Sequence, residues 1–295
     1  MKLKFILFFW LLGVLSSMAS IHSYSDNSVL SKGTWTKIRV SSTGVCKITY
    51  TELYDMGFSN PSKVRVFGYG GAILNEDFSK PKVDDLPELS IYDGGSFILF
   101  YAQGPIKWNY NENALNSRFG FEANPYSNYG YYFLTDNVGV GKRIAKEEVE
   151  TSDTAERVTD YVYYDLKRKE EMNFVNSGRQ WYGDMIYSGQ SKTYSFFVPN
   201  INMIKNSSVD VTYAGSSNKS TKMDVSCEGE TANIGLSYKS NHLKATEGTA
   251  SISFTPTSTV VPVSVKYNGD KGTDLAALNR IVLNAYCNLA MVSGI

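Results

Sequence analysis

Three cysteines and two histidines are the residues of this 295-residue chain best suited to nucleophilic chemistry: Cys46, Cys227, Cys287, His22 and His242. A catalytic thiolate needs a base within reach and an electropositive, partly exposed pocket. Each cysteine instead alternates with apolar residues along a strand-like segment, a pattern that predicts burial. We therefore expect inert core cysteines and no Cys/His dyad. A disulfide between Cys227 and Cys287 is the remaining alternative.

Other groups that could bind a ligand are incomplete. Residues 75–77 and 84–85 offer side-chain oxygens that suit calcium, but they lack the spacing of a calcium-binding loop. Residues 139–142 read Gly-Val-Gly-Lys without the spaced first glycine of a phosphate-binding loop. Basic and acidic residues number 29 each, so charge gives no reason to expect a nucleic-acid partner. The sequence predicts no catalytic residue, no metal site and no cofactor.

Aromatic side chains are abundant, with 21 tyrosines and 15 phenylalanines, and some of them could contact a partner. Trp108, Tyr126 and Trp181 are the candidates for contact with a protein or for stacking on a sugar. Packing and cross-strand pairing inside a sheet is the competing interpretation, because aromatic residues are common in β-strands.

The N-terminus has the pattern of a secretory signal peptide over residues 1–19. Two lysines precede an apolar run over residues 5–15, and small residues follow up to Ala19. Cleavage there would leave residues 20–33 as a flexible tail. The run is shorter than the roughly 20 residues that span a bilayer, so we expect no transmembrane helix after cleavage. The mature chain is expected to reach the periplasm, the outer membrane or the cell surface.

We expect a mainly β protein with two β-rich domains and at most one or two short helices after the signal peptide. The first domain, residues 34–155, is predicted to be mixed β with one short helix. Thr49 and Glu52 have the spacing of a capping box, and Gly57 can end that helix in a left-handed conformation. The central strand is predicted over residues 97–101, a continuous apolar run that we expect to be covered on both faces.

The second domain, residues 156–290, has a clearer pattern. Five segments alternate apolar with polar or small residues, and loops rich in Gly, Ser, Asn and Thr separate them. This pattern predicts an antiparallel sandwich, jelly-roll or immunoglobulin-like. The apolar positions are Tyr194, Phe196 and Val198; Val209, Val211 and Tyr213; Met223, Val225 and Cys227; Ile252 and Phe254; and Val261, Val263, Val265 and Tyr267.

Eight short motifs follow one another along the chain, at residues 35–38, 44–48, 66–68, 100–105, 124–127, 131–134, 178–184 and 278–286. Each is weak alone. Together and in this order they resemble the N-terminal, pre-catalytic region of the sortases of the type IX secretion system, which belong to the gingipain family of cysteine peptidases. The resemblance extends over essentially the whole chain after the signal peptide.

The resemblance implies a non-catalytic role for these residues. In that family the catalytic histidine and cysteine lie in a peptidase domain C-terminal to this region, so no catalytic residue carries over, and residues 291–295 are expected to be the truncated start of that domain. A complete member would cleave C-terminal sorting signals and attach cargo to surface lipopolysaccharide. This segment is expected to position cargo C-terminal domains or to dock to protein partners of the secretion machinery. The alternative is a stand-alone secreted β-sandwich for adhesion or glycan binding.

Overall fold

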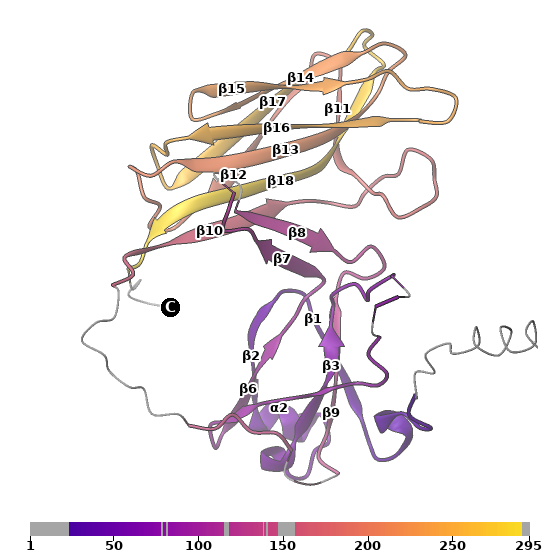
Figure 1. Ribbon diagram of the computed structural model, residues 1–295, viewed down its shortest axis with the longest axis vertical. Helices are drawn as coiled ribbons and strands as arrows, with labels where there is room; N and C mark the ends of the chain where they lie inside the picture. Colours follow the sequence, from indigo (N-terminus) through magenta and orange to yellow (C-terminus); the bar gives the residue numbers. More distant parts are fainter. Residues whose placement is uncertain are drawn as a thin grey trace, which may run out of the picture. The chain divides into compact units, whose positions relative to one another are not determined.

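The computed structural model describes residues 24–77, 79–80, 82–114, 118–137, 139, 141–146 and 157–290. It is mainly β and separates into two compact units (Figure 1). Unit 1 comprises the described residues of Met1–Pro105 and Tyr129–Ala145, and unit 2 those of Ile106–Asn128 and Lys146–Ile295. Residues 106–128 thus belong to unit 2, and the domain boundary near residue 155 stays a prediction. The signal peptide, His22 and residues 291–295 lie outside the described residues.

Unit 1 is built from two antiparallel sheets around one core. The first has the strand order β1 (Thr36–Val40), β9 (Gly130–Thr135), β3 (Arg65–Gly70) and β4 (Glu88–Leu89). The second has the order β2 (Gly44–Thr49), β6 (Phe97–Ala102) and β5 (Tyr92–Asp93). The core side chains come from both sheets and from the helix that follows β2; they include Leu53, Val66, Ile98, Phe100 and Leu134.

The predicted short helix is confirmed as α2 (Tyr50–Asp55), the α-helix among the described residues. The Thr49 hydroxyl accepts a hydrogen bond from the Glu52 amide at 3.2 Å, and the Glu52 carboxylate accepts one from the Thr49 amide at 2.7 Å. This capping box satisfies amide groups that the first turn of a helix leaves without partners. Gly57 follows at φ +94°, in the left-handed region that glycine adopts without strain. A 3-10 helix, η2 (Pro61–Lys63), leads from here into β3.

Strand β6 is central in its sheet as predicted, but the expectation that both its faces are covered is wrong. Ile98, Phe100 and Ala102 point into the core, whereas Tyr101 is 64% exposed. Its partner in the antiparallel register, Val45 on β2, is exposed as well. A continuous apolar run therefore lies in an ordinary two-faced strand whose outer face happens to be apolar.

The described part of the N-terminal segment, residues 24–33, is hydrogen-bonded to unit 1. It contains a 3-10 helix, η1 (Val29–Ser31), and Asp85 accepts hydrogen bonds from the Val29 amide and the Ser28 hydroxyl at 2.5 and 2.9 Å. Burial alone would raise the pKa of Asp85, but the bonds from Leu86, Val29 and Ser28 lower it. The acidic pair at 84–85 thus serves to anchor this segment.

Unit 2 contains the predicted antiparallel sandwich (Figure 1). One sheet has the order β10 (Asp160–Lys167), β18 (Leu275–Asn288), β13 (Ser207–Ser216) and β16 (Thr246–Phe254), with β11 (Gly183–Tyr187) pairing the first residues of β18. The other has the order β12 (Ser191–Phe197), β17 (Val260–Asn268), β14 (Thr221–Cys227) and β15 (Glu230–Leu236). Most successive strands alternate between the two sheets. This is the order of a jelly roll and not of an immunoglobulin domain.

The five predicted alternating segments all supply the sandwich core. Every apolar position named for them is buried and belongs to one hydrophobic cluster. The two hydroxyls of Tyr194 and Tyr213 meet inside that cluster at 2.7 Å, so these buried polar groups satisfy each other. A hydroxyl pair of this kind lets two large side chains fill the core while the oxygen of each takes part in a hydrogen bond.

The hairpin β7 (Ile106–Tyr110) and β8 (Phe119–Ala123) was not predicted, and it packs on the outer side of β10 and β18. The Asn284 side chain, on the outer side of β18, exchanges two hydrogen bonds with the Phe119 backbone, at 2.7 and 3.2 Å. Both faces of β18 are consequently covered, because its other face lies in the sandwich core. No helix in the described part of the chain is long and apolar enough to cross a membrane.

Candidate functional site

The three cysteines are free thiols, so the Cys227–Cys287 disulfide alternative is not supported. Cys227 and Cys287 are buried in the jelly-roll core, while Cys46, expected to be buried, is only half-buried. Burial raises the pKa of all three thiols, in the case of Cys227 to about 12. An activated cysteine has a lowered pKa, so this environment is the opposite of a catalytic one.

His242 is the histidine within the described residues, and it lies in the exposed loop between β15 and β16. Its backbone amide donates to the Ser240 hydroxyl at 3.3 Å. None of the hydrogen bonds of the described residues joins its ring to a cysteine. The part of the chain that the structure describes also holds no group of three or more His, Cys, Asp or Glu side chains arranged to bind a metal ion.

Trp108, the first of the three aromatic candidates, packs inside unit 2. Its ring lies 4.4 Å from the ring of Tyr164 and 5.8 Å from that of Phe121, measured between centroids. Tyr164 lies on β10, and Phe119 contacts the same ring at 4.2 Å. These contacts hold the β7–β8 hairpin on the sandwich. They leave Trp108 half-buried among other aromatic rings.

Tyr126 and Trp181 are more exposed, at 69% and 38%. The Arg179 guanidinium donates to the Tyr126 hydroxyl at 3.2 Å and lies 5.9 Å from the centroid of its ring. Arg179 and Trp181 belong to one loop before β11, so this loop and residue 126 lie side by side. A surface formed by an arginine and aromatic rings has the composition of protein contact sites.

Glu247, on β16, holds the loop that carries Arg179 and Trp181. One of its carboxylate oxygens accepts hydrogen bonds from the side chains of Gln180, Tyr182 at 2.9 Å and Asn279 at 2.6 Å. Burial and then the bond to Glu247 raise the pKa of Tyr182. The cluster therefore fixes the loop on the outer side of its sheet, and nothing in it resembles a reactive centre.

Asp184 forms a second charged cluster, at the bulge in β11. It has a positive φ of 43°, and its carboxylate lies 2.6 Å from the Lys192 amine and 3.3 Å from the Lys169 amine. Burial would raise the pKa of Asp184, but the two lysines lower it. A non-glycine residue in this conformation is strained. The two ion pairs hold Asp184 in place, so we assign this cluster a structural role at the bulge.

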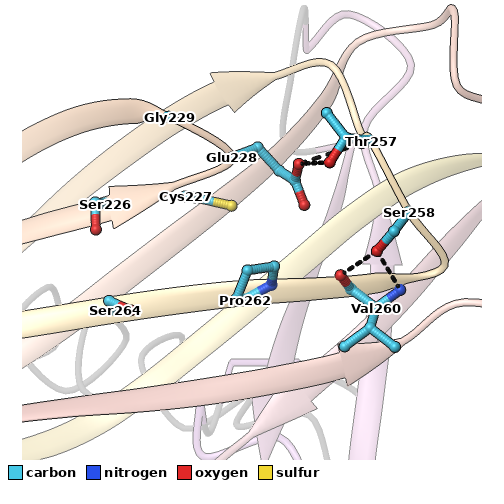
Figure 2. Close-up of a pocket in the computed structure, with 9 residues that line it drawn as sticks. All are labelled: Ser226, Cys227, Glu228, Gly229, Thr257, Ser258, Val260, Pro262 and Ser264. Atoms are coloured by element: carbon cyan, nitrogen blue, oxygen red, sulfur yellow. Dashed lines mark hydrogen bonds between the residues drawn. The ribbon is translucent and has the colours of Figure 1, made fainter.

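A hollow of about 360 Å³ lies at one end of the jelly roll, between the β14–β15 turn and the β16–β17 loop. Figure 2 shows the residues that line it. Glu228 reaches across it and accepts hydrogen bonds from the Thr257 amide and hydroxyl at 3.2 and 2.5 Å. Glu228 and Gly229 have φ of +50° and +86°, as a tight two-residue hairpin turn requires. One wall of the hollow is thus formed by two loops that these hydrogen bonds join.

The side of this hollow toward the sheet is formed by the small residues Ser226, Pro262 and Ser264 (Figure 2). Ser226 and Ser264 also line a second hollow of about 570 Å³ on the outer face of the same sheet. Sequence reasoning used the apolar members of these strands and passed over the polar ones between them. The alternation itself was the signal, because it places the polar members on the outer face.

Solved structures of known proteins share parts of this geometry. The chain is similar to a crystal structure of dimeric latent PorU from Porphyromonas gingivalis, with 28% sequence identity and a TM-score of 0.76. The fold is PorU-like. The match covers 90% of this chain and 25% of that chain, so this chain spans about a quarter of the length of PorU. No family model matches the sequence, and the comparison with curated proteins gives no match.

Two carbohydrate-binding modules are also similar in part. CBM36, in complex with calcium and xylotriose, has 16% identity and a TM-score of 0.27 over 43% of this chain and 99% of that chain. CBM35 from Cellvibrio japonicus has 7% identity and a TM-score of 0.29 over 42% of this chain and 92% of that chain. These scores are far below that of PorU and carry no argument about what this PorU-like chain binds.

Proposed function

We propose that these residues form the non-catalytic, N-terminal part of a PorU-like sortase and serve as a docking scaffold for proteins of type IX secretion. The PorU match over 90% of the chain, at a TM-score of 0.76, is the observation that supports this. The raised pKa values of the three cysteines fit a scaffold, because a peptidase nucleophile requires a readily formed thiolate.

In a PorU-like sortase, the chemistry would belong to a domain other than the one that these residues match. A PorU-like sortase would use a Cys/His pair to cleave C-terminal sorting signals from cargo and transfer the cargo to lipopolysaccharide. The chain described above would position the cargo C-terminal domain or dock the enzyme to secretion partners. Export to the periplasm, the outer membrane or the cell surface follows from the signal-peptide pattern at residues 1–19.

Two places on the surface suit such docking. In unit 1, the outer face of the β2–β6–β5 sheet exposes Val45, Tyr92 and Tyr101, and β6 lies between the other two strands. In unit 2, Tyr126 and Trp181 are exposed beside Arg179. Exposed apolar side chains that gather on one face mark protein contact sites more often than scattered ones do.

Binding to a cargo domain tests the proposal. The purified chain from residue 20 is mixed with the C-terminal domain of a type IX cargo protein, with P. gingivalis PorU as a positive control. We expect capture of the cargo domain, reduced at least about tenfold, or about 1.4 kcal/mol, by either Val45→Ser with Tyr101→Ser or Tyr126→Ala with Trp181→Ala. Val158→Ser with Tyr238→Ser changes two residues about as exposed as Val45 and Tyr101 and serves as the matched control.

Two results would contradict the proposal. Absence of capture while PorU binds the same domain would remove the docking role. Cleavage of a sorting-signal peptide by the purified chain, abolished by a thiol reagent, would show that the chain carries its own peptidase activity.

A further inference from the structure

The outer face of the β12–β17–β14–β15 sheet is hollowed and polar, and nothing in the docking proposal uses it. Its hollow of about 570 Å³ is lined by side chains from all four strands, among them Ser191, Asp224, Asn233 and Lys266. The opposite face of the same sheet is the apolar core of the jelly roll. The hollow therefore lies on a rigid element, where a binding site keeps its geometry.

The strand register aligns four hydroxyl side chains straight across this face. Thr193 on β12 lies opposite Ser264 on β17, which lies opposite Ser226 on β14, which lies opposite Thr231 on β15. We call these four residues the hydroxyl row. The Thr193 and Ser264 hydroxyls are hydrogen-bonded to each other at 2.8 Å. All four side chains are small and project less far from the sheet than their longer neighbours do. This difference in side-chain length accounts for the hollow.

The next row along the strands adds a positive charge, a negative charge and a side-chain amide. It consists of Ser191, Lys266, Asp224 and Asn233, again one residue from each strand. The Asp224 carboxylate accepts a hydrogen bond from the side-chain amide of Asn268 at 2.7 Å and lies 3.6 Å from the Lys222 amine. The face thus presents donors and acceptors close together without one dominant charge.

An apolar platform lies at the other end of the same face. Phe197 is 67% exposed and lies opposite the exposed Val260 in the strand register, and Pro262 follows on β17. Phe197 is four residues beyond Thr193 on β12, which places the platform about 13 Å from the hydroxyl row. A ligand that crosses the hollow can therefore contact hydroxyl groups and an aromatic ring together.

We propose that this face binds a neutral carbohydrate chain of a few sugar units, with the hydroxyl row and the Asp224 row bonding sugar hydroxyls and Phe197 stacking on a sugar ring. Carbohydrates carry many hydrogen-bond donors and acceptors along their edges and apolar faces on their rings. The two polar rows can bond the former, and Phe197 can stack on the latter. An acidic peptide fits less well, because Asp224 lies between Lys222 and Lys266. This assigns sugar contact to the outer sheet face, away from Trp108, Tyr126 and Trp181.

Affinity electrophoresis of the purified chain tests the proposal. The gels contain mannan, xylan, galactan or dextran, and a parallel titration uses poly-glutamate. We expect retardation by at least one neutral polysaccharide and none by poly-glutamate. Ser226→Ile with Ser264→Ile fills the hollow and should weaken binding at least about tenfold, while Phe197→Ala should weaken it several-fold.

The matched control is Ser253→Ile, the same change at an exposed position on β16 in the other sheet, which should leave retardation unchanged. Thermal unfolding of every variant verifies the fold. Failure of all four polysaccharides to retard the chain overturns the proposal, as does retardation that the filled hollow does not reduce. Tighter binding of poly-glutamate than of any polysaccharide also overturns it, since the face would then select acidic chains.

Discussion

Strands β6 and β18 are both apolar and both lie inside a sheet, but only β18 is covered on both faces. On β6 the side chains alternate between the core of unit 1 and solvent, so that Phe100 is buried and Tyr101 exposed. On β18 the inner residue Leu283 lies in the jelly-roll core, and the outer residue Asn284 is buried under the β7–β8 hairpin. The cover on β18 comes from Phe119, 165 residues earlier in the chain. The environment of a strand is thus decided by distant segments as well as by its own residues.

The largest effect is expected from two neighbouring residues of β6. Phe100→Ala should destabilise unit 1 by about 3–5 kcal/mol, because it removes a fully buried ring from the core. Tyr101→Ala should cost within about 0.5 kcal/mol, because that side chain faces solvent. Hydrogen exchange followed separately in peptides of each unit is the suitable measurement, since a two-unit chain need not unfold in one step. Equal losses from the two variants would mean that β6 is covered on both faces after all.

The cover on β18 is tested next, through Trp108. Trp108→Ala should destabilise the hairpin and the outer side of β10 by about 2–3 kcal/mol, because it removes the ring that packs on Tyr164 and Phe121. The loss is smaller than for a fully buried tryptophan, because Trp108 is half-buried. Lys107→Ala, a change at the exposed neighbour, serves as the control. Faster exchange in β10 and β18 is expected for Trp108→Ala only. Unchanged exchange there would show that the hairpin does not cover these strands.

The sequence predicted the parts of the fold that depend on local pattern. The capping box at Thr49 and the alternating strands of the sandwich were read correctly, because capping and alternation are properties of neighbouring residues. The β7–β8 hairpin was missed and Trp108 was offered as a surface residue, because a tryptophan on a short strand gives no local sign of what packs on it. The polar hollow was missed for a related reason. Serines between apolar residues look the same on a flat sheet and on a hollowed one.

The hydrogen bonds of Asn284 come next in size. Asn284→Ala should destabilise unit 2 by about 1–3 kcal/mol, because it leaves the amide and carbonyl of Phe119 without their partners in a buried contact. Asn109→Ala replaces an exposed asparagine of the hairpin and should have little effect. Denaturant unfolding with an exchange measurement on β8 compares the two variants. A smaller loss from Asn284→Ala than from Asn109→Ala would argue that the hairpin is held by its aromatic residues alone.

The effect expected to be smallest near neutral pH is a pH dependence of stability that again separates the two units. Cys46, opposite Phe100 on the β2–β6 pair, is half-buried, whereas Cys287 on β18 and Cys227 are buried. A thiol reagent at pH 8 should therefore modify Cys46 first and the other two only on unfolding.

Burial raises the folded-state pKa of Cys227 from 9.0 to about 12, so the unfolded chain loses this proton first. Loss of the Cys227 proton at high pH is expected to lower the stability of the folded chain. Stability from the protonated Cys227 is fully present below pH 9 and declines between 9.0 and about 12, by about 1.4 kcal/mol at pH 10. Buried tyrosines add to the same decline, so the comparison that isolates the thiol is the slope of stability against pH in the native chain and in Cys227→Ala. The slope of Cys227→Ala should be shallower above pH 9, while Cys46→Ala, a change at the half-buried thiol, should alter the slope less. If Cys46→Ala flattened the slope more, the thiol of unit 1 would be the more deeply buried one, and the contrast between a half-buried Cys46 and an enclosed Cys227 would have to be reversed.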